Sequence, residues 1–363
     1  MSRIQQIFRD HAAEYAERLG DTVPEAHRRV IQALCDCRSG ACGHHLFECP
    51  QCRQQHVANS SCGNRHCPVC QNEKAAEWVY QRQMDLLPCT YFMATFTLPR
   101  GLRRLARRRQ KIVYDLLFQA SQQALQKLAA DPKYIGGSLG MIGVLQTWTR
   151  DLRYHPHVHY LIPAGGLAPN GAWRAARHNY LLPEKPLAQI FRAKFRDLLK
   201  KAGLFDQVPS DLWQKDWVVD IITVGSGETA VKYLAPYVFR VALSNRNILA
   251  LKNGRVTFRY RDAKTATTQT TTLPAEQFIR RFLHHVLPRG FQKVRTYGLL
   301  HPKQRDSLAR VKELLHHKGL GNAKPVPRPA RPISGGSPTA VLCPSCACEM
   351  IHIGQIFRKR GPP

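Results

Sequence analysis

Eight of the 12 cysteines lie between positions 35 and 70, and this density constrains the fold more than any other sequence feature. A segment of this length buries too little apolar surface to be stable by packing alone. In a secreted chain such density predicts disulfides, whereas in a basic intracellular chain it predicts zinc. Bound zinc would then supply most of the folding free energy of this module, on the order of 10 kcal/mol per ion.

Two C-x2-C pairs, Cys49/Cys52 and Cys67/Cys70, set the pattern of the module. A turn of this kind places two sulfur atoms on one tetrahedral ion. The two pairs could share one zinc or each anchor its own, and we favour two ions because further ligand types lie close by. The expected ligands are Cys37, His45, Cys49 and Cys52 for one ion, and Cys62, His66, Cys67 and Cys70 for the other. We expect both sites to be closed and structural.

The C-terminal part contains a second, smaller group of cysteines. A segment rich in Pro, Gly, Arg and Ser, at about 319–338, is typical of a flexible linker. Beyond it, the pair Cys343/Cys346 resembles half of a zinc ribbon, with Cys348 and His352 following. Half a site leaves open whether the tail binds metal, or whether ligands from elsewhere complete it.

The chain is strongly basic, with 54 Lys and Arg against 25 Asp and Glu and a formal net charge of +29. This balance favours a polyanionic partner, with nucleic acid first and an anionic membrane surface as the rival. No stretch approaches the ~18 consecutive apolar residues of a membrane-spanning helix, and residues 1–6 lack a signal-peptide core. We therefore expect a soluble cytoplasmic protein that binds DNA and has no membrane partner.

Six arginines crowd residues 100–109. Such a cluster forms either a solvated helix face or a surface that contacts phosphates, and the overall charge of the chain favours phosphate contact. The candidate DNA-binding residues are Arg103, Arg104, Arg107, Arg108 and Arg109.

Three histidines, His155, His157 and His159, occupy every second position of one stretch. Because side chains alternate between the two faces of a β-strand, all three would point the same way. Imidazole is a common metal ligand, so this face predicts a metal site. Residues 141–148 form an apolar strand pattern, and a short polar turn separates them from the histidines. Two strands so close in sequence predict an antiparallel hairpin. Acids are scarce here, and Asp151 is the one close by.

Tyr233 and Tyr237 lie four positions apart in the segment 228–240, which we interpret as a helix. Residues at this spacing share one helix face, and Pro236 between them would kink the helix. Taken by itself, the pair fits two core tyrosines. Together with a metal-binding strand, the pair suggests nucleophilic catalysis. An ion on the histidines would polarise a phosphodiester, and a tyrosine would attack it. The phosphotyrosine bond conserves the bond energy, so a cut strand can be joined to a new partner.

Six segments together resemble the two-tyrosine HUH transposases of rolling-circle insertion sequences, which carry an N-terminal zinc-binding domain. The segments are Ser61–Cys70 at the end of the cysteine module, Phe96–Pro99, Leu145–Trp148, His155–His159, Tyr233–Tyr237 and Arg295–Gly298. They occur in the family's order and cover about residues 30–305. Each motif alone is unspecific, whereas the combination is specific.

The resemblance implies that His157 and His159 bind Mg2+ or Mn2+ and that the two tyrosines are nucleophiles. It implies single-strand nicking through a 5′-phosphotyrosine intermediate and strand transfer, with single-stranded element ends as the DNA partner. Relatives usually carry His where this chain has Gln146. The third ligand therefore stays open, with His155 as first choice and Gln146 as second, since an amide oxygen also ligates a hard cation.

The expected fold class is α+β, with residues 1–88 as a helical and zinc-binding domain, 89–305 as the catalytic domain and 306–363 as a basic linker and Cys-containing tail. The resemblance gives the catalytic domain an antiparallel, ferredoxin-like or RRM-like sheet with the histidine strand at its centre. Three other functions are rivals. A metal-dependent phosphoesterase would need more carboxylates and would have no use for the tyrosines, which leaves two rivals. A replication initiator or relaxase would use the same chemistry in another domain context, and a non-catalytic zinc-dependent DNA-binding protein would leave the histidines and tyrosines unexplained.

Overall fold

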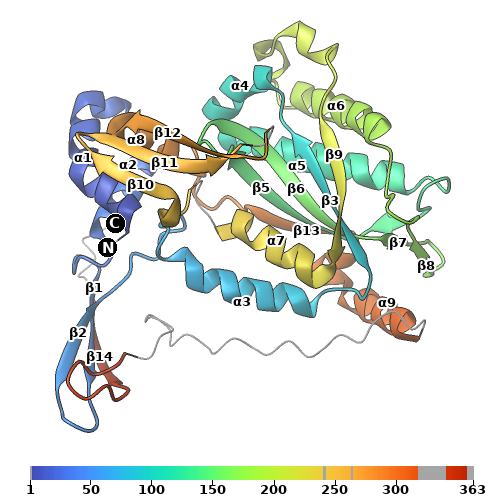
Figure 1. Ribbon diagram of the computed structural model, residues 1–363. Coiled ribbons are helices and arrows are strands. Elements are labelled where there is room, and N and C mark those ends of the chain that lie inside the picture. The colour runs from blue at the N-terminus through green and yellow to red at the C-terminus, as the bar shows by residue number, and fades with distance from the viewer. Residues whose placement is uncertain (1, 240–242, 263–264, 318–340, 358–363) are drawn as a thin grey trace.

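A five-stranded antiparallel sheet forms the centre of the computed structural model (Figure 1). The structure describes residues 2–239, 243–262, 265–317 and 341–357, and in it the side chains of residues 71–76, 236, 237 and 239 are left undescribed. The strands, in the order β13-β5-β6-β3-β9, are β13 (Val294–Tyr297), β5 (Met141–Trp148), β6 (Tyr154–Pro163), β3 (Thr90–Thr97) and β9 (Val219–Ser226). The histidine strand β6 is thus central and pairs with β5 as a hairpin, and the α+β class is confirmed.

Alternation along β6 gives its two faces different partners. Val158 and Tyr160 are fully buried in a core shared with α5 and α6. Leu161 points the opposite way and packs in a second core with α7. The odd-numbered positions of β6, which include the histidines, therefore lie on the α7 side of the sheet (Figure 1). The helices around the sheet are α5 (Gln110–Ala129), α6 (Glu184–Lys201), α7 (Gly227–Phe239), α3 (Gln71–Met84) and α9 (Arg305–His317).

A second layered unit joins the N-terminal helices to a later part of the chain. Helices α1 and α2 share one apolar core with α8 and the sheet β10-β11-β12. In that core the rings of Phe8 and Phe282 meet edge-on, with 5.2 Å between their centroids. Ser2 begins α1 with a capping box that Gln5 completes. The elements are α1 (Arg3–Leu19), α2 (Glu25–Asp36), β10 (Ile248–Lys252), β11 (Arg255–Arg261), β12 (Thr268–Pro274) and α8 (Ala275–Leu283).

A three-stranded sheet with the order β14-β1-β2 extends away from the rest of the molecule (Figure 1). Its strands are β1 (Gly43–Glu48), β2 (Gln55–Asn59) and β14 (Ile351–Phe357). Shorter elements are α4 (Arg103–Arg108), the sheet β4-β7-β8 (Ser138–Leu139, Gly165–Leu167, Trp173–Ala175) and 3-10 turns at Gly20–Thr22, Arg100–Leu102, Phe205–Gln207, Ser210–Trp213, Asn245–Asn247, Gly298–Leu300 and Pro302–Gln304. Within the described ranges, none of the helices combines the length and the apolar character that crossing a bilayer requires.

We predict that Phe8→Ala lowers the free energy of unfolding by about 3–5 kcal/mol, because Phe8 is fully buried against α8 and its truncation leaves a cavity. Denaturant titration followed by circular dichroism measures the change. Ile112→Ala is the control, since Ile112 is 41% exposed and its truncation should cost about 0.5 kcal/mol or less. Equal losses in the two variants would contradict the packing of α1 described above.

Candidate active site

A cavity of about 890 Å3 lies on the α7 side of the central sheet. The sheet contributes Gln146, His157 and His159 to its wall, and α7 contributes Tyr233. The cationic residues of the wall are Arg150, Lys232, Arg259 and Arg261. Two predicted metal ligands and one predicted nucleophile thus share a cavity whose charge suits a phosphate-bearing ligand.

The imidazole rings of His157 and His159 lie side by side, with 4.7 Å between their centroids and 83° between their planes. His157 Nδ1 donates a hydrogen bond of 2.6 Å to the backbone carbonyl of His155, so its Nε2 carries the lone pair that a metal would bind. His159 Nδ1 lies 3.0 Å from the hydroxyl of Thr95. These contacts fix both rings from behind, as outer partners of metal-binding histidines do.

Burial keeps both histidines neutral at physiological pH. It is the largest cause that holds the pKa of His157 well below its usual range, and the neighbouring His159 lowers it further. Burial also lowers the pKa of His159 to about 4. A neutral imidazole is the form that ligates a cation, so the sheet presents both side chains ready for metal.

Gln146 lies beside the histidine pair in the cavity, whereas His155 does not line the cavity, although its ring centroid is 5.3 Å from that of His157. Gln146 Oε1 is 3.3 Å from His159 Nε2, close to the separation of about 3 Å between adjacent ligands of an octahedral ion with bonds of about 2.1 Å. The Gln146 amide donates to the carbonyl of Trp148 at 2.8 Å, which turns its oxygen toward His159. His155 instead contacts the guanidinium of Arg103 and does not line the cavity. The cavity thus contains Gln146, the second candidate for the third ligand, and leaves out His155, the first.

The two tyrosines both belong to α7, which runs from Gly227 to Phe239 through Pro236. The Tyr233 side chain is 44% exposed and faces the cavity that contains the histidines. Tyr237 lies one helical turn further on, and its side chain is outside the described part of the structure. The sequence-predicted nucleophile and metal strand are therefore brought together at Tyr233, although they are far apart in the chain.

An acid that the sequence analysis did not single out also lines this cavity. Antiparallel pairing places His159 opposite Thr95 and Thr95 opposite Asp220, so Asp220 lies in the same row of the sheet. Burial, followed by the nearby Glu184, raises the pKa of the Asp220 carboxyl. Asp151, the acid nearest in sequence, is instead paired with Arg153. Only the register of β3 with β9 reveals the proximity of Asp220 to the histidines.

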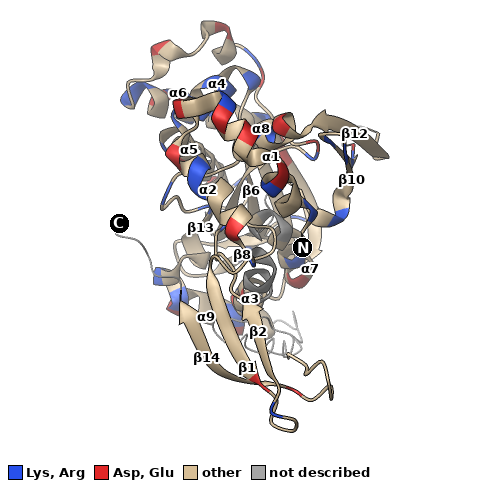
Figure 2. Ribbon diagram, turned by 90° about the vertical axis from the view of Figure 1, so that its left-hand side faces the viewer, with Lys and Arg blue, Asp and Glu red and all other residues tan. Residues whose placement is uncertain are grey.

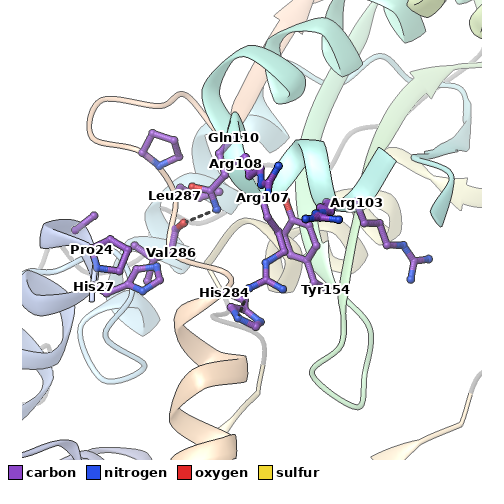
Figure 3. A pocket seen from close by; sticks show the side chains of 13 residues that line it. Pro24, His27, Arg103, Arg107, Arg108, Gln110, Tyr154, His284, Val286 and Leu287 are labelled. Atoms are coloured by element: carbon purple, nitrogen blue, oxygen red, sulfur yellow. Dashed lines mark hydrogen bonds between the residues drawn. The ribbon is translucent and has the colours of Figure 1, made fainter. Parts of the chain in front are cut away.

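The arginines of α4 surround a second cavity, of about 670 Å3, between α4 and the N-terminal helical unit (Figure 3). Arg103, Arg104, Arg107 and Arg108 line it, whereas Arg109 lies outside at the start of α5. Arg107 donates to Nε2 of His284 at 2.7 Å. Figure 2 shows Lys and Arg on α4, above helices α1 and α2. Arg103 also contacts His155, so this group of arginines begins beside the histidine strand and continues away from it.

The cysteines form two clusters, each with four sulfur atoms within 4.8 Å of one another. One cluster contains Cys37, Cys62, Cys67 and Cys70, and the other contains Cys49, Cys52, Cys343 and Cys346. Neighbouring sulfurs of the first cluster are 3.6 Å apart. Tetrahedral zinc, with Zn–S bonds of about 2.3 Å, separates its sulfurs by about 3.8 Å, so the donor set fits zinc.

The membership of the clusters corrects the pairing expected from proximity in sequence. Cys37 joins the Cys67/Cys70 pair, although it is nearer in sequence to the Cys49/Cys52 pair. The reason is the hairpin of β1 and β2, which carries the Cys49/Cys52 turn to its tip and leaves Cys37 and Cys62 together at its base. A strand of six residues spans about 20 Å, far beyond the reach of one ion.

The two expected histidine ligands, His45 and His66, lie outside both clusters. His66 is buried, and its Nε2 accepts a hydrogen bond of 3.4 Å from the Leu287 backbone. His45 lies on β1 with its Nδ1 3.2 Å from Nε2 of His352. Cysteines distant in sequence occupy the ligand positions that had been assigned to these histidines.

Two family models match the chain. Residues 7–98 match a model described as a transposase zinc-binding domain, and residues 140–307 match one described as a putative transposase. The first range contains the whole Cys37 cluster, and the second contains the histidine strand and both tyrosines.

Two curated relatives carry related descriptions. The putative transposase y4qJ of Sinorhizobium fredii (strain NBRC 101917 / NGR234) is 35% identical, over 99% of this chain and 97% of the relative. The transposase for insertion sequence element IS801 of Pseudomonas savastanoi pv. phaseolicola is 27% identical, over 71% of this chain and 65% of the relative. The similarity to the first relative along nearly the whole chain, together with the two family models, shows that this chain belongs to the IS91 family of transposases.

Proposed function

We propose that this transposase nicks and rejoins single-stranded DNA at the ends of its mobile element, through a 5′-phosphotyrosine intermediate. The observation that carries the proposal is the convergence of Tyr233, His157 and His159 on one basic cavity. A DNA-binding protein without catalytic activity would gain nothing from a tyrosine beside two neutral histidines. A catalytic function uses all three.

His157, His159 and Gln146 are the residues that would hold the catalytic Mg2+ or Mn2+. When bound, such an ion polarises the scissile phosphodiester and stabilises charge on the attacking and leaving oxygens. The two imidazoles take part as neutral donors, and the Gln146 oxygen supplies a hard ligand. His159 Nδ1 would donate to the Thr95 hydroxyl, and His157 Nδ1 donates to the His155 carbonyl, so both rings are oriented with Nε2 available to the ion.

Tyr233 acts as the nucleophile in the proposed reaction. Its hydroxyl oxygen bonds to the phosphorus, and the bond between the phosphorus and the 3′-oxygen breaks. The tyrosine loses its proton and the 3′-oxygen leaves as a hydroxyl, so charge and atoms balance. Attack by another 3′-hydroxyl on the phosphotyrosine reverses these steps and joins the strand to a new partner. Tyr237, one turn along α7, would serve the second cleavage that transfer of both element ends needs.

The cationic walls would position the DNA strand. Arg150, Arg259 and Arg261 line the catalytic cavity, where they can neutralise phosphates on either side of the scissile bond. The α4 arginines line the second cavity and extend the positive surface toward the N-terminal helices. Single-stranded DNA suits these cavities because its flexible backbone can follow their cationic walls.

We predict that Tyr233→Phe combined with Tyr237→Phe abolishes covalent DNA attachment, because the phenyl rings keep the packing and remove both nucleophilic oxygens. Labelled single strands covering the element ends, incubated with Mg2+ or Mn2+, should give a denaturation-resistant adduct with wild type and none with the double variant. Tyr180→Phe is the matched control, since Tyr180 is similarly exposed at 39% and lies outside the cavity. An adduct from the double variant would remove the tyrosine assignment.

Mn2+ affinity, measured by calorimetry in the absence of DNA, separates the two candidates for the third ligand. We expect Gln146→Ala to weaken binding at least about tenfold, as much as the loss of an outer partner usually does. His155→Ala should leave the affinity nearly unchanged, because His155 contacts Arg103 outside the cavity. The opposite result in the two variants would restore His155 as the ligand.

The double substitution Arg107→Gln/Arg108→Gln should weaken single-stranded DNA binding about equally for all sequences. It should also reduce the slope of log affinity against log salt by about 0.7 for each phosphate that the variant no longer neutralises. Fluorescence anisotropy at several salt concentrations measures both effects. Arg196→Gln/Lys201→Gln on α6 removes the same charge outside both cavities and should leave the slope unchanged. Equal slopes in wild type and the α4 variant would exclude this surface as a DNA contact.

A further inference from the structure

We propose that the C-terminal segment 341–357 completes a second zinc site, and that this ion fastens the C-terminal end of the described chain to the N-terminal module. The four ligands are Cys49, Cys52, Cys343 and Cys346. The match to the transposase zinc-binding domain ends at residue 98, so it contains only half of this ligand set. The proposal is independent of the nicking chemistry, because it concerns metal content and chain attachment alone.

Two turns of the same construction supply the four sulfurs. Segments 49–52 and 343–346 share the sequence Cys-Pro-x-Cys. In each turn the next residue has a positive φ, 58° at Arg53 and 57° at Ala347. That residue's N–H donates to the carbonyl of the first cysteine, at 3.0 Å in one turn and 2.9 Å in the other. Two equivalent turns that face each other offer the paired sulfurs of a tetrahedral zinc site.

The distances between the turns fit one shared ion. Cys49 Sγ lies 3.4 Å from Cys346 Sγ, and Cys52 Sγ lies 3.4 Å from Cys343 Sγ and 3.7 Å from Cys346 Sγ. Zinc–sulfur bonds of about 2.3 Å would hold tetrahedral sulfurs about 3.8 Å apart. Each contact crosses from one turn to the other, so neither turn alone could build the site.

Packing by itself is too weak to hold the C-terminal segment in place. β14 pairs with β1 from Gly43 to Glu48, but the core beneath them contains only Phe47, Cys49, Cys343 and Met350 among the buried residues of that cluster. Two of these four are proposed ligands. On β14 itself, Ile356 and Phe357 remain 65% and 74% exposed. A small sheet with so little buried apolar surface depends on a bound ion for its stability.

The consequence is a metal-dependent link between the two ends of the described chain. Cys52 and Cys343 are 291 positions apart, so the ion closes a loop that contains the catalytic sheet. Figure 1 shows β14 beside β1, far from α9, the described helix that precedes it in the chain. A chain that stops before Cys343 would make the Cys37 cluster but not this one. The complete zinc module would therefore form only on chains synthesised beyond Cys346.

Zinc content of the purified full chain tests the site, measured by mass spectrometry under reducing conditions. We expect two zinc ions per chain in wild type and one in either Cys49→Ser/Cys52→Ser or Cys343→Ser/Cys346→Ser. Combining all four substitutions should also leave one, because both pairs serve the same ion. Cys348→Ser is the matched control in the same segment, and it should retain two because Cys348 belongs to neither cluster. A single zinc in wild type, or two in the tail variant, overturns the proposal.

Attachment of the tail needs its own measurement, because sulfurs 3.4 Å apart could also form disulfides. A protease site inserted between residues 318 and 340 and a C-terminal affinity tag allow the tail to be cut free in the folded chain. We expect the tail to retain the rest of the protein in reducing buffer and to release it when a zinc chelator is added. Release by the reductant alone, or no retention before the chelator, overturns the proposal. Tyr233→Phe should behave as wild type in both measurements, which separates this inference from the proposed nicking function.

Discussion

The pairing of β6 with a strand on each side is the interaction on which the catalytic arrangement depends. β5 on one side brings Gln146 beside His159, and β3 on the other brings Thr95 behind the same ring. Both neighbours pair with β6 beside the histidines, so the backbone at His157 and His159 is held from two sides. The packing of Val158 and Tyr160 against α5 fixes which face carries the imidazoles. The histidines and Gln146 of the candidate site are therefore positioned by the central strands of the sheet.

The zinc clusters follow a different constraint, which is the length of the β1–β2 hairpin. Its strands separate the Cys49/Cys52 turn at the tip from the cysteines at the base, so one ion cannot serve both groups. Each group must then find partners elsewhere in the chain. Cys37, at the end of α2, lies with the cysteines at the base of the hairpin. Cys343 and Cys346 of the C-terminal segment lie with the pair at its tip. The same hairpin offers β1 as the template to which β14 adds.

The local pattern of the sequence predicted the secondary structure of the site well. Alternating histidines indicated a strand, and that strand is β6; the preceding apolar run is β5, and the two form the expected hairpin. Segment 228–240 was interpreted as a helix, and α7 runs from Gly227 to Phe239. These predictions succeed because the period of the side chains reflects backbone geometry alone. The roles of these tyrosines and histidines in catalysis remain predictions that rest on the family and on their shared cavity.

By itself, the sequence determined which residue types could bind metal and which segments form strands and helices, since both depend on neighbours along the chain. Tertiary structure alone decided which of these residues meet. It placed Gln146 rather than His155 beside His159 and brought Asp220 into the same row. It also moved Cys37 to the other cysteine cluster and replaced His45 and His66 by Cys343 and Cys346. The physical reason is that strand register and hairpin length set distances between side chains far apart in sequence, and no local period encodes those distances.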